Sequence, residues 1–99
     1  MSSDRLIRRY VVRGRVQGVG FRWFVEREAN QLGLAGWVRN NEDSTVELVA
    51  AGDAEQHRRL KERLAAGPRA SRVDRVDESA ATAAELEGSE LRFEIQGAW

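Results

Sequence analysis

Residues 14–22 read Gly-Arg-Val-Gln-Gly-Val-Gly-Phe-Arg, and this stretch decides how the rest of the chain is arranged. An apolar run over residues 7–12 precedes it and predicts a strand, and residues 23–32 follow it with the spacing of a helix. Glycine allows positive φ angles and lets a backbone approach a ligand closely. The stretch therefore predicts a strand-to-helix turn whose N–H groups and helix N-terminus can hold an anion.

Arg22 lies in the first turn of the expected helix and adds a planar guanidinium suited to phosphate oxygens. The spacing alone leaves an alternative open, because many strand-to-helix turns carry glycine only to turn tightly. Arg22 would then be a surface arginine at a helix start. The stretch matches neither the P-loop, which needs Gly-Lys-Ser/Thr, nor the G-x-G-x-x-G of dinucleotide-binding loops.

The length and composition predict one small domain. The chain has 99 residues and no cysteine, which excludes disulfides and cysteine-based metal sites. It contains no apolar run long enough to span a membrane, and its first five residues lack the apolar core of a signal peptide. We expect a single domain over residues 1–99, with residues 1–5 loose, in a cytoplasmic protein that is a monomer.

The net charge is zero but unevenly distributed. Residues 1–40 hold eight arginines and three acidic residues, whereas residues 41–99 hold eight basic and thirteen acidic residues. The glycine-rich turn lies in the basic half, where a positive field would attract an anionic substrate. The alternative is a solvated sheet face that carries arginines.

Hydrophobic periodicity divides the chain into strands and helices. The expected strands are residues 6–13, 35–40, 45–51, 72–79 and 91–95, with helices at 23–32 and from Asp53 to Gly67, and a loop or single helical turn at 80–88. Asp53, with Gln56 three residues later, predicts a capping box. The order predicts an α+β, ferredoxin-like split β-α-β sandwich: β-α-β-β-α-β plus a short extra strand, with two helices on one face of an antiparallel sheet.

Several side chains have structural interpretations. Ala54, His57, Leu60 and Leu64 mark the inner face of the second helix, and Leu91, Phe93 and Ile95 share one face of the last strand. The lone histidine lacks the partners that a catalytic or metal-binding histidine needs, so we expect a surface or half-buried position. Trp23 and Trp37 are expected to be packing residues. The acidic residues from 74 to 94 predict a solvated face, and we expect no metal and no cofactor.

Two segments carry longer motifs at a fixed separation. The first, Gly-x-Val-Gln-Gly-Val-x-Phe-Arg, is complete at Gly14, Val16, Gln17, Gly18, Val19, Phe21 and Arg22. The second, Gly-aromatic-Val-x-Asn, three residues, Gly-x-Val, five residues and Gly, is matched at Gly36, Trp37, Val38, Asn40, Val46 and Gly52. Together they resemble the signatures of the acylphosphatase family. Ser44 stands where the family has a turn glycine, which predicts a strained or altered turn there.

The resemblance implies hydrolysis of the carboxyl–phosphate anhydride of acyl phosphates, without a metal or a covalent intermediate. It implies that Arg22 is the catalytic arginine, that Asn40 holds the attacking water, and that the phosphate is bound by the backbone N–H groups of Arg15, Val16, Gln17, Gly18 and Val19. Asn40 could instead be a turn former at a strand end. The side chains of Val16 and Gln17 are better explained by loop architecture.

Three rival functions stay open at this point. Ferredoxin-like sheets also carry RNA-recognition domains, but those need aromatic residues on the third strand, and residues 45–51 have none. A second rival is the acylphosphatase-like domain of a carbamoyl-phosphate-using maturation enzyme, although we expect no further domain here. The third is an inactive relative that only binds phosphate. We expect the partner to be a small acyl phosphate, with no nucleic acid and no membrane.

Overall fold

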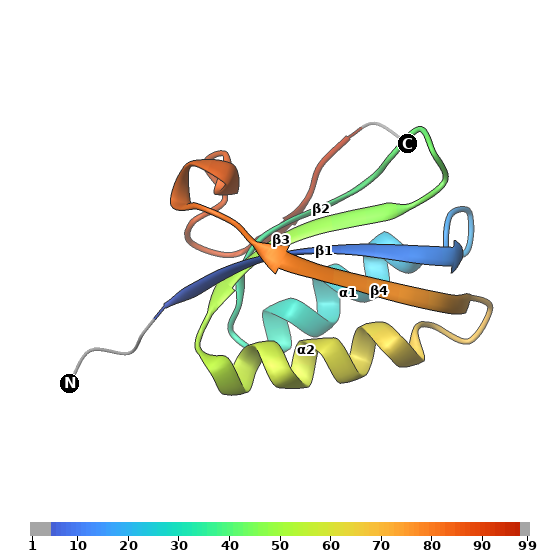
Figure 1. Cartoon of the computed structure of the whole chain (residues 1–99), viewed down its shortest axis with the longest axis horizontal. Helices are drawn as coiled ribbons and strands as arrows, with labels where there is room; N and C mark the ends of the chain where they lie inside the picture. Colours follow the sequence, from blue (N-terminus) through green and yellow to red (C-terminus); the bar gives the residue numbers. More distant parts are fainter. Residues whose placement is uncertain (1–4, 98–99) are drawn as a thin grey trace.

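The computed structural model describes residues 5–97. Within this range the chain forms five strands, two α-helices and one 3-10 helix (Figure 1). In chain order they are β1 (Leu6–Arg15), α1 (Phe21–Gln31), β2 (Ala35–Asn40), β3 (Val46–Gly52), α2 (Ala54–Ala66), β4 (Arg72–Ala80), η1 (Ala83–Leu86) and β5 (Phe93–Ile95). Every expected element is present. The expected loose end, residues 1–5, falls almost wholly outside the described residues.

The strands form one sheet in the order β4-β1-β3-β2-β5. The first four pair antiparallel, which confirms the ferredoxin-like arrangement. The short β5 instead runs parallel to β2, with Gly36 opposite Phe93, so the expectation of a wholly antiparallel sheet was wrong. After β4 the chain reverses direction and reaches the opposite edge of the sheet, where β2 already runs the same way.

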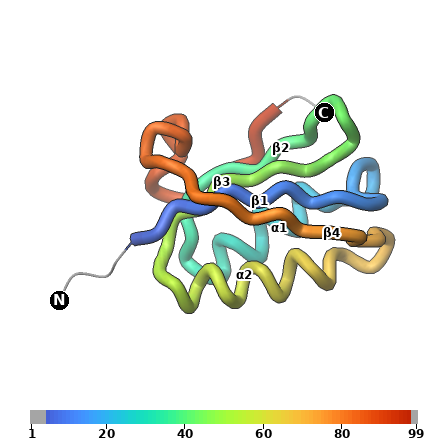
Figure 2. The backbone as a smooth tube through the Cα atoms, in the orientation of Figure 1, coloured from blue at the N-terminus to red at the C-terminus, as the bar shows by residue number. Residues whose placement is uncertain are grey.

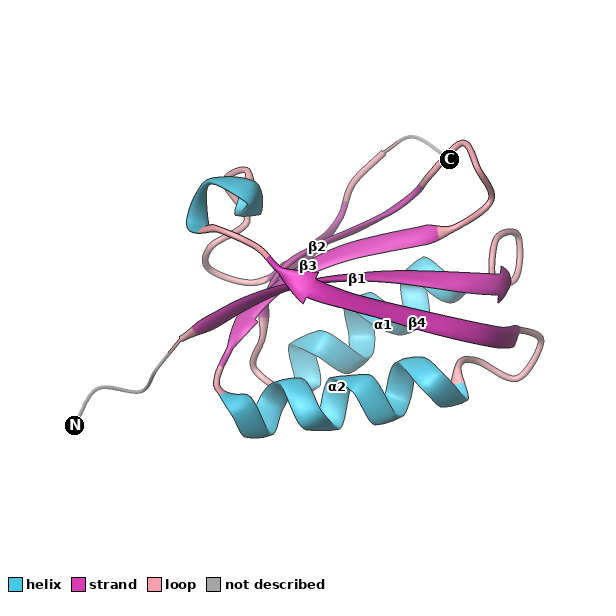
Figure 3. Cartoon of the chain, in the orientation of Figure 1, coloured by secondary structure: helices cyan, strands magenta, loops and turns pink. Residues whose placement is uncertain are grey.

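Both helices cover one face of the sheet (Figure 3). Their apolar stripes pack on inward-facing side chains of β1 and β3 to form the main core, which includes Tyr10, Val12, Phe21, Val25 and Leu60. Burial of this apolar surface is the main stabilising contribution to the fold. Ala54 is exposed at the first position of α2, so its expected place on the inner face was wrong.

The opposite face of the sheet carries a smaller cluster that η1 helps to cover, formed by Trp37, Val49, Ala51 and Leu86. Trp37 is buried, and its indole N–H donates to the carbonyl of Glu85 at 2.7 Å, which confirms its packing role. Because both faces are covered, β3 is buried along its full length. Trp23 is 71% exposed, so its expected packing role was wrong. Two residues after the buried Phe21, it points to the other side of the helix.

A β-bulge sets the approach of β1 to β4. The pairing register shifts between Arg13 and Gly14 and skips Asp74. The extra residue brings Val73 and Val76, three positions apart, against the same core. A Cβ on Gly14 would lie 2.1 Å from the carbonyl oxygen of Arg72, so only glycine fits there.

The helix ends agree with the sequence. The side chain of Asp53 accepts from the N–H of Gln56 at 2.8 Å, and the Gln56 side chain accepts from the N–H of Asp53 at 2.7 Å. This confirms the capping box. Gly67 ends α2 with a φ of 66°. The last strand is shorter than expected, and Leu91 was wrongly placed in it, since it precedes β5 and is 98% exposed.

Candidate active site

The loop between β1 and α1 and the turn between β2 and β3 lie at the same end of the sheet (Figure 2). A small hollow lies between this loop and the end of β2. Its volume is about 180 Å³, and it is lined by Val16, Gly18, Gly20, Phe21, Arg22, Trp23 and Asn40. The fold therefore brings the glycine-rich turn, the start of α1 and the last residue of β2 to one place.

Gly18 and Gly20 give the loop its shape. Their φ angles are 74° and 79°, in the left-handed region that L side chains rarely adopt. A Cβ built on either would meet nothing within 4 Å beyond its chain neighbours. Backbone conformation, and not crowding, therefore requires glycine at both positions. The same open space leaves the loop backbone accessible to a ligand.

The N-terminus of α1 adds unsatisfied donors to this loop. The helix begins directly after Gly20, with no side-chain cap and no acidic residue in its first turn. Its first backbone bond runs from the N–H of Phe24 to the carbonyl of Gly20 at 3.0 Å. The three preceding N–H groups thus lack an intrahelical acceptor. Together with the helix dipole, they favour an anion at this end.

Arg22 is the cation of the hollow. Its side chain is half-buried and forms no hydrogen bond or ion pair with any residue between 5 and 97. On β1, by contrast, Arg8 and Arg13 are ion-paired to Glu78 and Asp77, each at 2.9 Å. An unpaired guanidinium beside free N–H donors can bind two oxygens of a phosphate-like group.

Gln17 ties the loop to the next strand. Its side-chain amide donates to the carbonyls of Asn41 and Thr45, both at 2.8 Å. These bonds hold the end of β2, and with it Asn40, beside the glycine-rich loop. Val16 is 1% exposed and packs into the core. The architectural roles expected of the Val16 and Gln17 side chains are confirmed.

The turn after Asn40 is held by local hydrogen bonds. The carboxylate of Asp43 accepts from the hydroxyl of Thr45 at 2.6 Å and from its N–H at 3.1 Å, and these bonds lower the pKa of Asp43. Ser44 adopts a φ of 75°, in the left-handed region that favours glycine, and the strain expected of a serine in the family's glycine position stays a prediction.

Of the five expected phosphate-binding residues, two line the hollow, and Arg15, Gln17 and Val19 do not. Val16 and Gly18 line the hollow, whereas Val19 packs against the core. Arg15 ends β1 and lines a separate shallow hollow beside β4. Trp23 also lines the hollow, a role that was not expected from the sequence. Its position off the apolar stripe of α1 was the signal that could have found it.

His57 lies in the core and away from the hollow. It is 4% exposed, which confirms its expected place on the inner face of α2, whereas the expected surface or half-buried position was wrong. Its Nε2 lies 2.9 Å from the carbonyl of Leu6, which can only accept, so Nε2 carries the proton. Nδ1 then accepts from the hydroxyl of Tyr10 at 2.6 Å. Burial lowers the pKa of His57 and favours this neutral form.

Two kinds of feature are absent from residues 5–97. In this part of the chain, no group of three or more His, Cys, Asp or Glu side chains is arranged to hold a metal ion. The same residues include no helix with the length and apolar character needed to cross a membrane.

Known proteins resemble this chain over most of its length. A family model described as Acylphosphatase matches residues 8–95. An acylphosphatase of Koribacter versatilis (strain Ellin345) is 53% identical over 100 residues, which cover 100% of this chain and 87% of that protein. An acylphosphatase of Nitrobacter hamburgensis is 51% identical over 75 residues, or 76% of each chain.

Solved structures also resemble this chain. The crystal structure of acylphosphatase from Bacillus subtilis has a TM-score of 0.84 and 40% identity, covering 93% of this chain and 99% of that chain. Full-length HypF, in its phosphate- and nucleotide-bound form, has a TM-score of 0.82 and 27% identity over 98% of this chain but 12% of that chain. The chain therefore belongs to the acylphosphatase family, the hydrolases that cleave the carboxyl–phosphate anhydride of acyl phosphates.

Proposed function

We propose that this chain hydrolyses acyl phosphates by direct attack of a water held by Asn40 on a phosphoryl group bound by the loop and Arg22. The observation that carries the proposal is the single hollow that unites an open left-handed loop, an unpaired guanidinium and an amide side chain. Phosphoryl transfer needs mainly positioning and stabilisation of negative charge, and these groups supply both.

The phosphoryl oxygens are bound by backbone N–H groups between Arg15 and Val19 and by the fork of Arg22. Successive N–H groups around a left-handed turn point into one concavity, which is a geometry suited to an oxyanion. The charge that Mg²⁺ neutralises in many phosphoryl-transfer enzymes is neutralised here by the guanidinium. We therefore expect the activity to persist in the presence of EDTA.

Asn40 orients the water and does not remove its proton, because an amide does not ionise near neutral pH. Its side chain can accept from a water and donate to it, which fixes the direction of attack. The leaving carboxylate needs no general acid, since the pKa of its conjugate acid is about 4. The water's proton passes to an oxygen of the substrate phosphate, so no side chain has to act as a base.

The rival RNA-binding function finds little support in the sheet. Base stacking on a ferredoxin-like sheet uses exposed aromatic side chains on the third strand. Here β3 has no aromatic residue and is buried over all of Val46–Gly52. The exposed aromatic residue next to the hollow, Trp23, belongs to α1.

The test is hydrolysis of benzoyl phosphate in EDTA by the wild type, Arg22→Ala and Asn40→Ala, each checked for folding by circular dichroism. We expect kcat/KM to fall about a thousandfold without Arg22 and about a hundredfold without Asn40. Arg27→Ala is the matched control, because Arg27 lies on the same helix outside the hollow and pairs with Glu28 at 3.1 Å. Full turnover by Arg22→Ala would refute the mechanism, and an inert folded wild type would refute the function.

A further inference from the structure

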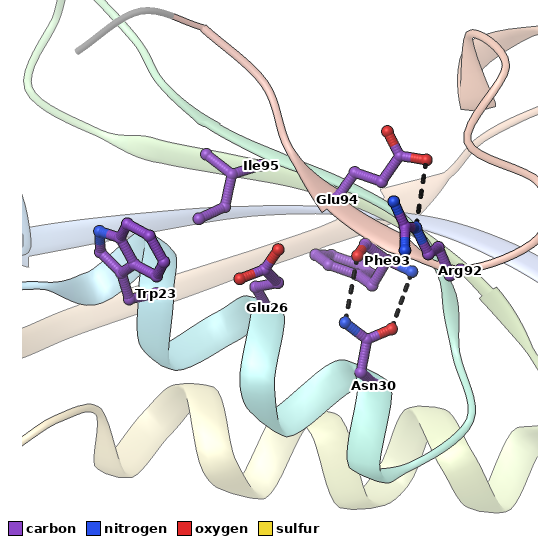
Figure 4. A pocket seen from close by; sticks show the side chains of 7 residues that line it. All are labelled: Trp23, Glu26, Asn30, Arg92, Phe93, Glu94 and Ile95. Atoms are coloured by element: carbon purple, nitrogen blue, oxygen red, sulfur yellow. Dashed lines mark hydrogen bonds and ion pairs between the residues drawn. The ribbon is translucent and has the colours of Figure 1, made fainter.

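A larger hollow adjoins the first one, between α1 and β5 (Figure 4). Its volume is about 440 Å³, and it is lined by Trp23, Glu26, Asn30, Arg92, Phe93, Glu94 and Ile95. We call it the α1–β5 groove. Trp23 lines both hollows, so a molecule bound in the first can extend over the indole into the second.

The walls of the groove are fixed by Asn30. Its side-chain amide donates to the carbonyl of Phe93 at 3.1 Å, and its oxygen accepts from the N–H of Phe93 at 2.9 Å. These two bonds satisfy the N–H and carbonyl of Phe93 on the outer edge of β5 and hold that strand against α1. The ring of Phe93 is 1% exposed and lies beside Glu26 in the view of the groove (Figure 4). The groove is therefore a defined feature of the fold, with walls held by specific contacts.

The end of the groove nearest the first hollow is apolar. Trp23 from α1 and Ile95 from β5 lie across from each other at this end (Figure 4). The indole is 71% exposed, although an exposed aromatic surface of this size is unfavourable in water. A large exposed aromatic side chain beside an anion site is typical of a ligand-binding surface.

The charges of the groove disfavour a second anion. Glu26 lies at its centre and forms no ion pair with any residue in the described range 5–97. Arg92, at the far end, is already paired with Glu94 at 4.0 Å. An acyl group with its own negative charge would thus meet an unneutralised carboxylate, whereas an uncharged group would not.

We propose that the α1–β5 groove is the acyl-binding subsite and selects acyl phosphates whose acyl group is an uncharged aromatic or branched apolar group. This inference rests on the proposed function: the phosphoryl group occupies the first hollow, and the acyl group lies over Trp23 toward Ile95. These two side chains determine specificity by packing on the acyl group. Glu26 excludes acyl groups that carry an additional carboxylate or phosphate.

The kinetic test compares kcat/KM for benzoyl phosphate and acetyl phosphate. We expect the wild type to prefer benzoyl phosphate, and the ratio of the two values to fall about tenfold in Trp23→Ala and about threefold in Ile95→Ala. Leu91→Ala is the matched control, because Leu91 is 98% exposed and does not line the groove. It should leave the ratio unchanged. An unchanged ratio in both groove variants would overturn the subsite.

A test of the charge uses Glu26→Gln with succinyl phosphate, whose acyl group carries a carboxylate. Removing the carboxylate of Glu26 should raise kcat/KM for succinyl phosphate about fivefold relative to benzoyl phosphate. No relative gain would overturn the exclusion role of Glu26.

A binding measurement separates this inference from the proposed function. Phenacylphosphonate and acetonylphosphonate carry a CH₂ group in place of the anhydride oxygen and cannot be hydrolysed. By calorimetry, the wild type should bind the phenacyl compound about tenfold more tightly, and Trp23→Ala should bind both with similar Kd values. If the wild type keeps this preference but hydrolyses no acyl phosphate, the proposed function fails and the subsite stands. If it hydrolyses both acyl phosphates but binds the two phosphonates equally, the subsite fails and the function stands.

Discussion

Arg9 and Arg22 put the same side chain to two uses. On β1, Arg9 donates to the carboxylates of Glu47 and Glu85, and Glu47 also pairs with Arg39 at 3.3 Å. At the first hollow, Arg22 has no such partner among residues 5–97. A charge neutralised within the chain therefore holds elements together, whereas a charge left unpaired at a hollow is available to a ligand.

The largest expected difference is that loss of Arg22 lowers activity, whereas loss of Arg9 lowers stability. Arg22→Ala should lose about a thousandfold in kcat/KM while its free energy of unfolding changes by less than about 0.5 kcal/mol. Arg9→Met should lose about 2 kcal/mol of unfolding free energy, because it leaves Glu47, with a side chain 11% exposed, short of its main partner. Its kcat/KM per folded molecule should equal that of the wild type. Urea unfolding and benzoyl phosphate hydrolysis measure the two quantities.

The distinction between a structural and a ligand-binding arginine would be contradicted if Arg9→Met lowered kcat/KM per folded molecule as far as Arg22→Ala does. An equal loss of unfolding free energy in both variants would also contradict it. Arg27→Ala again serves as the control for removal of an arginine from α1.

Two glycines extend the comparison to the backbone. Gly14 has a φ of 134° and is packed against the carbonyl of Arg72, whereas Gly18 has a φ of 74° and open space around it. Gly14→Ala should therefore lose about 3 kcal/mol of unfolding free energy or more, because the strands must separate. Gly18→Ala should lose about 1 kcal/mol, since only the left-handed backbone resists alanine.

For activity the order should be reversed: Gly18→Ala should be the more affected of the two variants. Gly18→Ala should raise KM for benzoyl phosphate, because a methyl group and a changed backbone angle disturb the phosphate-binding loop. Any folded fraction of Gly14→Ala should keep the wild-type KM. Equal losses of stability in the two variants, measured by urea unfolding, would contradict the distinction between a packed and an open glycine.

The buried Tyr10–His57 pair predicts a dependence of stability on pH. Burial lowers the pKa of His57 in the folded state, so the unfolded chain binds more protons as the pH falls. The stabilising contribution is fully present above the ordinary histidine value of about 6.5 and is lost as the pH falls through that value toward the folded one. The slope for this one group approaches 1.4 kcal/mol per pH unit.

Urea unfolding between pH 7.5 and 5.5 measures this slope, and His57→Gln is the control that removes the titrating group. The wild type should lose more stability over this range than the variant. Identical slopes would contradict the prediction. The pH dependence of kcat/KM should be the same in both proteins, because His57 lies outside both hollows.

Features set by local chemistry could be predicted from the sequence. The capping box needs only Asp53 and Gln56, and the position of β2 followed from its flanking turns. The paired motifs predicted that Arg22 and Asn40 lie close together, and both line the first hollow. The anion site at the glycine-rich turn stays a prediction. These features depend on contacts over a few residues or on a signature that already encodes the fold.

Features that depend on contacts between residues distant in sequence could not be predicted. The parallel pairing of β5 depends on where the chain lies after β4, and no local pattern reports this. The helical spacing placed His57 on the inner face of α2, but its hydrogen-bond partner Tyr10 lies 47 positions away and could not be predicted. The α1–β5 groove requires Trp23 and Ile95 on facing elements, and each residue alone is consistent with ordinary packing.

The smallest expected effect concerns the turn that follows Asn40. Ser44 and Glu87 both have positive φ angles, 75° and 52°, and both are exposed. Glycine would relieve strain of about 1 kcal/mol at either position, partly offset by the greater entropy of the unfolded chain. Ser44→Gly and Glu87→Gly should therefore each raise the free energy of unfolding by about 0.5 kcal/mol and the Tm by about 3 °C.

Glu87→Gly is the matched control, because Glu87 ends η1 and lies in neither hollow, whereas Ser44 lies four residues after Asn40. If the turn only adds rigidity, both variants should keep the wild-type kcat/KM for benzoyl phosphate. An unchanged Tm in Ser44→Gly would show that the left-handed serine is not strained. A fall of kcat/KM in Ser44→Gly alone would mean that the turn positions Asn40. Residues 41–44 would then belong to the active site and not only to the structural part of the molecule.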